Sequence, residues 1–161
     1  MGQHFTPTHI AELTLCGLRG TPTSILDPMA GHGGFLEQSV KRYPYANIVG
    51  VEIDPLPLHA AKLITDGKIT LISADVFAWA KERVKDNPSC NFYAIVGNAA
   101  YVSYQNLPRL KQLNIHNKKT HDYRTYLLRT LEEMTIAKGA ILDVAYIFKE
   151  WSGLSDLAHI Q

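Results

Sequence analysis

The 161-residue chain has few cysteines, no strong charge imbalance and no long apolar run. Its two cysteines, Cys16 and Cys90, lie far apart and form no C-x-x-C pair, which argues against a zinc site or a disulfide framework. A net charge of +1 does not require a nucleic-acid or membrane partner for the chain as a whole. Met1 to His4 lack the features of a signal peptide, so we expect a cytoplasmic protein without a membrane partner.

The composition suits one globular domain. Hydrophobic residues make up 46% of the chain and charged residues 19%, which fits neither a disordered tail nor a membrane protein. The seven histidines are scattered without the spacing of metal ligands, so no metal site is expected. Nothing repeats internally and no segment is of low complexity.

The rest of the chain is organised around Ile25 to Phe35, ILDPMAGHGGF. Apolar residues lead into Asp27-Pro28, and the glycines Gly31, Gly33 and Gly34 precede a segment compatible with a helix. This order predicts a strand, a tight turn and a helix start, where glycine permits positive φ and the close approach of a ligand. Free N–H groups at a helix start suit a carboxylate or a phosphate. An ordinary strand-to-helix turn is the alternative.

Strands and helices alternate along most of the chain. The expected strands cover 24–26, 47–55, 69–75 and 92–96, and the expected helices cover 8–18, 35–43, 56–65, 76–84 and 123–136. The stretch 140–151 fits a helix or a strand. We expect Ile10, Leu13 and Leu18 on one side of the first helix, and Leu58, Ala61 and Leu63 or Ile64 on the buried side of the third. This alternation implies right-handed βαβ units and a parallel sheet.

Candidate polar residues follow the ends of the expected strands. Glu52, Asp54, Asp75 and Asn98 stand there, at the edge where ligands bind in doubly wound sheets. A carboxylate at such a strand tip suits ribose hydroxyls, as Glu52 would provide. Asp54 is better explained as a helix cap than as a ligand.

The segment 106–124 is basic and is expected to form a loop. Its five cationic residues are opposed only by Asp122. Such a run is either a solvated surface or a contact to a DNA backbone. We divide the chain into a core, 1–105, and a second part, 106–161, that holds this loop and a helical segment leading towards further strands.

Several stretches together resemble the gamma-type N6-adenine DNA methyltransferases, the N-P-P-Y family, and this resemblance covers about residues 1–105. The order of the motifs is as specific as their letters. The similar stretches are Gly2–Pro7 (F-T-P for F-x-T-P), Asp27–Phe35 (D-P-x-x-G-x-G-G-F), Val51–Pro55 (the ribose-binding strand end), Ser73–Phe77 (the motif that holds the adenine of the cofactor) and Gly97–Tyr101 (in the place of G-N-P-P-Y).

The resemblance implies a partial Rossmann-like methyltransferase fold that binds S-adenosylmethionine. The implied cofactor-binding residues are Thr6, Asp27, Pro28, Gly31, Gly33, Glu52, Asp75, Val76 and Asn98. The sheet is expected to be truncated after about four strands, with 92–96 as an open edge. A second polypeptide or a missing C-terminal segment would then complete the sheet and read the DNA sequence.

The resemblance also implies the catalytic residues, and here the sequence departs from the family. Asn98 would accept a hydrogen bond from the amino group of a flipped-out adenine, and Tyr101 would stack on that base. Ala99 and Ala100 replace two prolines, which fix the shape of the loop. We therefore expect methyl transfer to be lost and cofactor binding to be largely kept.

Three functions remain open at this point. The first is the cofactor-binding part of a site-specific adenine-N6 DNA methyltransferase of the restriction-modification or phage-defence type, inactive as written. The second is a methyltransferase acting on RNA or on a protein amine. The third is a non-catalytic subunit that binds S-adenosylmethionine or DNA in a larger assembly.

Overall fold

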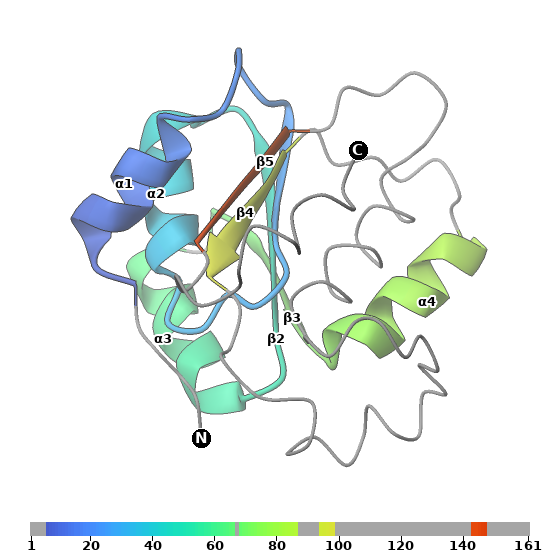
Figure 1. The fold of residues 1–161 in the computed structure, drawn as a ribbon. Coiled ribbons are helices and arrows are strands. Elements are labelled where there is room, and N and C mark those ends of the chain that lie inside the picture. The colour runs from blue at the N-terminus through green and yellow to red at the C-terminus, as the bar shows by residue number, and fades with distance from the viewer. Residues whose placement is uncertain (1–5, 67, 87–93, 99–142, 148–161) are drawn as a thin grey trace, which may run out of the picture.

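The structure is a computed structural model that describes residues 6–66, 68–86, 94–98 and 143–147 (Figure 1). Its strands are β1 (Ser24–Asp27), β2 (Asn47–Glu52), β3 (Thr70–Ser73), β4 (Ala94–Asn98) and β5 (Asp143–Ile147). Its helices are α1 (Thr8–Leu15), α2 (Gly34–Arg42), α3 (Pro55–Ile64) and α4 (Val76–Asp86). The expected basic loop and the helix over 123–136 lie outside the described residues.

All described strands are parallel and form one sheet in the order β3-β2-β1-β4-β5. The chain first builds outward from β1 through β2 to β3, and then returns to add β4 on the other side of β1. The order therefore reverses between β1 and β4, which is the kind of place where open α/β sheets bind ligands. The expected α/β class with a parallel sheet is confirmed.

The described sheet has one strand more than the four that were expected. β5 pairs in parallel with β4 along its whole length, from Ala94 opposite Asp143 to Asn98 opposite Ile147. The alternatives left open for 140–151 are thus resolved for Asp143–Ile147 in favour of a strand. β4 is not an open edge, because it pairs with β1 on one side and with β5 on the other.

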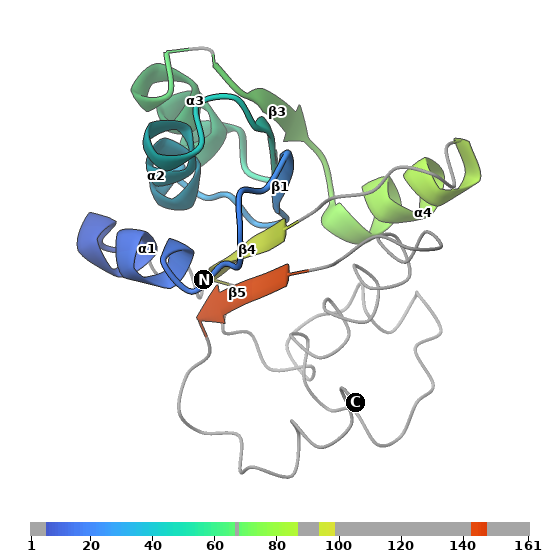
Figure 2. The same ribbon diagram turned by 90° about the horizontal axis from the view of Figure 1, so that it is seen from above.

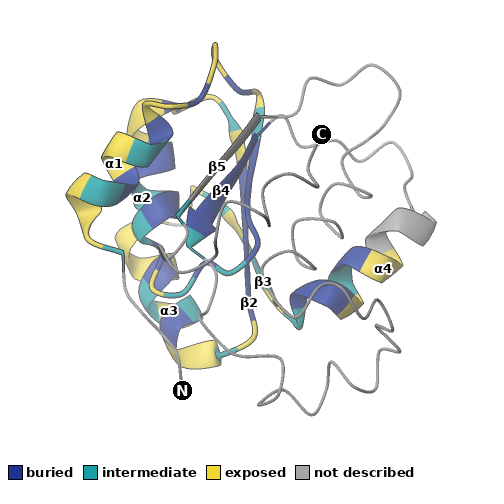
Figure 3. Cartoon of the chain, in the orientation of Figure 1, coloured by how far each residue is buried: buried dark blue, intermediate teal, exposed yellow. Residues whose placement is uncertain are grey.

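The strands nearest the middle of the sheet are almost wholly buried. Ile25, Leu26, Val51, Ile95 and Val96 are all nearly inaccessible to solvent. Continuous apolar runs of this kind are typical of parallel strands covered on both faces. Figure 3 shows the same arrangement, with buried residues along the strands and on the sides of the helices that turn towards them.

The helices lie on two faces of the sheet. α1, α2 and α3 gather on one face and α4 lies on the other, and the two views in Figures 1 and 2 agree on this. The change of face accompanies the crossover from β3 to β4, as right-handed βαβ connections require. At the end of α2, the Tyr43 hydroxyl donates a hydrogen bond to the Leu15 carbonyl at 3.3 Å and so ties α2 to α1.

Two expected helix faces differ from the observed ones. In α1 the buried residues are Ala11 and Leu15, whereas Leu13 is 70% exposed. In α3 Ala61 is buried and Leu63 is 69% exposed. The physical reason is close packing: each helix approaches its neighbours through a small alanine, and this turns the adjacent larger side chains outward.

Candidate active site

Four polar residues meet the same edge of the sheet because their strands are parallel. Asp27 ends β1, Glu52 ends β2 and Asn98 ends β4, while Asp75 follows β3 by two residues. The register places Asp27 beside Gly50 and Glu52 beside Ser73. The sequence prediction that these polar residues lie at strand ends is confirmed.

Asp27 is a buried acid at the centre of this edge. It is only 1% exposed, and its Oδ1 accepts a hydrogen bond from the Met29 N–H at 3.1 Å. The pKa of Asp27 is raised from its ordinary 3.8 to about 7, mainly because the carboxyl group is buried. The hydrogen bond from the Met29 N–H opposes this rise in the pKa, and the negative charge of Glu52 adds to it. A cation placed beside this group would favour its charged form.

Glu52 joins two turns of the backbone. Its Oε2 accepts a hydrogen bond from the Gly31 N–H at 2.8 Å, and its Oε1 accepts one from the Asp54 N–H at 2.9 Å. The N–H of Ala30 also bonds to the carbonyl of Val51, at 2.9 Å. The glycine-rich turn is thus attached to the end of β2 by both backbone and side chain.

The glycines of the turn serve different purposes. Gly31 has φ +51°, and a Cβ there would meet nothing within 4 Å, so its surroundings are open. Gly33 has φ +84°, and a Cβ there would lie 2.8 Å from the Cβ of Ala61. Gly33 is therefore required for the packing of the turn against α3, a role that the sequence did not indicate. Pro28, between the strand and the turn, is buried.

The acids after β2 and β3 cap helices. Asp54 Oδ1 accepts from the Leu56 N–H at 3.0 Å at the start of α3, which confirms the expected cap. Asp75 Oδ1 accepts from the Phe77 and Ala78 N–H groups at 3.0 and 3.1 Å. Asp75 thus has a structural role besides the one implied for it, and Val76, the first residue of α4, is buried beside it.

Thr6 and Asn98 are brought together from sequence positions 92 residues apart. The Nδ2 group of Asn98 donates a hydrogen bond to Thr6 Oγ1 at 3.2 Å, and both side chains are half-buried. The sequence assigned the two residues to one site but contained no signal for this bond. Ala99, Ala100 and Tyr101 lie outside the described residues.

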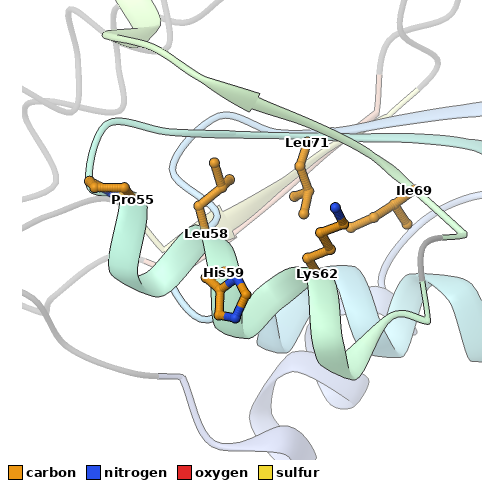
Figure 4. Close-up of a pocket in the computed structure, with 6 residues that line it drawn as sticks. All are labelled: Pro55, Leu58, His59, Lys62, Ile69 and Leu71. Atoms are coloured by element: carbon orange, nitrogen blue, oxygen red, sulfur yellow. The ribbon is translucent and has the colours of Figure 1, made fainter.

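A separate hollow of about 400 Å³ lies between α3 and β3 (Figure 4). It is lined by Pro55, Leu58, His59, Lys62, Ile69 and Leu71. The helix residues line one side of it and Ile69 and Leu71 the other. None of these residues was a candidate from sequence, and none ends a strand at the ligand-binding edge.

In the part of the chain that the structure describes, no three histidine, cysteine, aspartate or glutamate residues are grouped so as to hold a metal ion. No helix among the described residues is long and apolar enough to cross a membrane. Cys16 is a free, exposed thiol.

Comparison with known proteins identifies the family. A family model described as N-6 DNA Methylase matches residues 1–149, which include the strand ends and the glycine-rich turn. The chain belongs to the N-6 DNA methylase family. The expected membership of the N6-adenine DNA methyltransferases is thereby confirmed.

Three curated relatives of this N-6 DNA methylase segment are Type II methyltransferases. The chain is 30% identical over 108 residues to the Type II methyltransferase M.XamI of Xanthomonas campestris pv. amaranthicola, covering 66% of this chain and 20% of that protein. It is 35% identical over 102 residues to the Type II methyltransferase M.CvrRI of Paramecium bursaria Chlorella virus XZ-6E, covering 62% and 24%. It is 32% identical over 114 residues to the Type II methyltransferase M.HincII of Haemophilus influenzae, covering 70% and 19%. The chain thus spans about a fifth to a quarter of the length of these relatives.

Proposed function

We propose that the edge formed by Asp27, the glycine-rich turn, Glu52 and Asp75 binds S-adenosylmethionine. The chemistry of the available groups supports this. A zwitterionic amino acid requires a carboxylate for its amine and N–H donors for its carboxylate, and a nucleoside requires acceptors for its hydroxyl and amino groups. All of these groups are present along one edge of the sheet.

The amino-acid end of the cofactor fits the half of the site around Asp27. A cationic amine beside Asp27 would compensate the burial of its carboxylate, which by itself favours the protonated form. The carboxylate of the cofactor would meet the backbone of the turn at Gly31 and Gly33, ahead of α2. The open space at Gly31 leaves room for that approach. Thr6 and Pro28 would complete this end of the site.

The nucleoside end fits the carboxylates after β2 and β3. Each oxygen of Glu52 already accepts one backbone hydrogen bond, and a carboxylate oxygen can accept a second from a ribose hydroxyl. Asp75 uses Oδ1 to cap α4, and its other oxygen would accept from the adenine amino group. Val76 would contact the adenine ring.

The reaction that we propose for this site is methylation of the N6 amine of adenine in DNA, within a restriction-modification system. The cofactor supplies an electrophilic methyl group. Asn98 would accept a hydrogen bond from the amine of the flipped base, and Tyr101 would stack on its face. The motifs and the family membership support this assignment. We also propose that another segment or polypeptide reads the DNA sequence, and that the protein works in the cytoplasm.

One observation favours a second candidate, a non-catalytic cofactor-binding protein. Ala99 and Ala100 stand where the family has two prolines, so the backbone after Asn98 is less restricted. In this candidate the site binds S-adenosylmethionine but transfers no methyl group. Methylation of an amine in RNA or in a protein also stays open, because the N-P-P-Y type of loop suits any planar amine.

Cofactor binding is tested by titration calorimetry of the intact chain with S-adenosylmethionine. We expect saturable binding with about one molecule of cofactor per chain. S-adenosylhomocysteine, which has the same amino-acid and nucleoside ends, should compete for the site. A chain that is folded by circular dichroism and binds neither compound would overturn the proposed function.

A further inference from the structure

The contact between Thr6 and Asn98 suggests a role for Thr6 beyond holding the cofactor. We propose that Thr6 is a positioning residue that fixes the orientation of the Asn98 side-chain amide. This inference rests on the proposed function, in which Asn98 accepts a hydrogen bond from the target amine. It adds a residue of the N-terminal segment to the control of the base-binding side of the site.

The chemistry of the amide group makes its orientation decisive. A carboxamide has a donor end, Nδ2, and an acceptor end, Oδ1, on one planar group. Only Oδ1 can accept a hydrogen bond from an exocyclic amine, and rotating the amide by half a turn would present a second donor in its place. Because Nδ2 donates to Thr6 Oγ1 at 3.2 Å, the donor end is directed towards Thr6 and the acceptor end away from it.

The backbone around Thr6 keeps its hydroxyl at this distance. The Thr6 carbonyl oxygen lies so close to the start of α2 that a Cβ on Gly34 would be 3.1 Å from it. Pro7 follows directly, and its carbonyl accepts from the N–H groups of Ile10 and Ala11 at 3.0 and 3.1 Å at the beginning of α1. Thr6 therefore lies between the start of α1 and the start of α2, and both contacts restrict its backbone.

The position of Asn98 is equally well fixed. It is the last residue of β4, with β5 paired beside it at Ile147 and β1 on the opposite side of the strand. The backbone of Asn98 cannot move far without breaking the sheet, and the backbone of Thr6 cannot move far without disturbing the contact between α1 and α2. The amide can still rotate about its side-chain torsions, and in the structure the bond to Thr6 Oγ1 holds its donor end towards Thr6. The rate of a reaction that depends on alignment is sensitive to the orientation of the groups that hold the substrate.

The inference is tested by nuclear magnetic resonance of the ¹⁵N-labelled intact chain. The side-chain NH₂ signal of Asn98 is identified by its loss in Asn98→Asp. Thr6→Val removes the acceptor but keeps the shape, and Thr6→Ser keeps the hydroxyl. We expect the Asn98 NH₂ protons to exchange with solvent about threefold to tenfold faster in Thr6→Val, and at the original rate in Thr6→Ser. Thr21→Val, at an exposed threonine, is the matched control and should leave the signal unchanged.

Calorimetry with S-adenosylmethionine on the same variants separates this inference from the proposed function. Because Thr6 also belongs to the proposed cofactor site, Thr6→Val is expected to weaken cofactor binding as well, whereas the Asn98 signal of the cofactor-free chain reports on the position of the amide alone. An Asn98 signal that is identical in Thr6→Val and the parent chain would overturn the inference and leave the cofactor site untouched. A parent chain that binds no cofactor, with the Asn98 signal changed as expected, would overturn the proposed function and with it the role that we assign to the amide.

Discussion

The Oε2 atom of Glu52 accepts a hydrogen bond from the backbone N–H of Gly31 at 2.8 Å. The end of β2 therefore holds the glycine-rich turn in place before any ligand binds. The same carboxylate is the proposed acceptor for the ribose hydroxyls. In the proposed function, this one side chain would shape the part of the site for the amino-acid end of the cofactor and also bind the nucleoside end.

Replacing Glu52 by alanine is expected to lower the affinity for S-adenosylmethionine by about tenfold to more than a hundredfold. The change removes a charge-assisted acceptor, which typically contributes about 1.5 to 3 kcal/mol, and releases the Gly31 N–H. Calorimetric titration measures the effect. Glu37→Ala is the matched control, because Glu37 pairs with Lys41 on the outside of α2 at 2.7 Å. Equal affinities in both variants would remove Glu52 from the ribose site.

Asp27→Asn is expected to stabilise the cofactor-free chain at pH 8. In the folded chain burial raises the pKa of Asp27 to about 7, from an ordinary value of 3.8. Between these values the folded chain retains a proton that the unfolded chain has released, so stability falls as pH rises from about 4 to about 7 and is then constant. The full loss is about 4 kcal/mol, at about 1.4 kcal/mol for each pH unit between the two pKa values. Asparagine avoids this loss and can still accept from the Met29 N–H.

Urea unfolding of Asp27→Asn and the parent chain at pH 5 and pH 8 measures this difference. The variant should already be more stable than the parent chain at pH 5, and the difference should grow by about 2 to 3 kcal/mol at pH 8. Cofactor affinity should change in the opposite direction. In the parent chain it should rise from pH 6 to pH 8 as Asp27 ionises, and in the variant it should be weak and nearly independent of pH. A parent chain whose stability does not vary over this range would contradict the raised pKa.

Gly33→Ala is expected to destabilise the chain by about 2 to 4 kcal/mol. Its Cβ would lie 2.8 Å from that of Ala61, and its φ of +84° is unfavourable for alanine. Gly31→Ala is the matched comparison, since its φ of +51° carries a similar backbone cost but its surroundings are open. Gly31→Ala should therefore cost only about 1 kcal/mol. Thermal unfolding distinguishes them; equal losses would mean that contact with α3 does not determine the choice of glycine at position 33.

Local signals in the sequence were sufficient for the first four strands, because each is an apolar run followed by an acid, an amide or a glycine. The cap at Asp54 was also predicted, since aspartate before proline is a strong helix-start signal. The strand Asp143–Ile147 was not settled by its sequence, because an apolar run of that length fits a helix equally well. Its pairing with Ala94–Asn98 decides it, and pairing partners distant in sequence leave no local pattern.

The same limit applies to the candidate site. Asp27, Glu52 and Asp75 could be placed at one edge from strand order alone. The exposure of Leu13 and Leu63 could not, because it depends on which neighbour approaches through Ala11 or Ala61. The bond between Thr6 and Asn98 depends on how Thr6 lies against the start of α2, which no local pattern encodes.

Replacing Ala99 and Ala100 by proline is expected to introduce or increase methyl transfer. In-line attack by the amine requires its nitrogen to be aligned with the sulfonium methyl group, and a misplacement of about 1 Å can reduce the rate about a hundredfold. Proline restricts φ and would therefore restrict the residues that follow Asn98. Asn98 itself is held in β4 by its pairing with β5. Incorporation of tritiated methyl groups into unmethylated duplex DNA, followed by nucleoside analysis, should show N6-methyladenine in the proline form.

The double change to glycine is the control, since it loosens the loop further. If the alanine form transfers methyl groups as fast as the proline form, the two alanines are not inactivating. If the proline form labels RNA or protein and leaves DNA unlabelled, the substrate is an amine in RNA or protein and the proposed reaction on DNA is wrong.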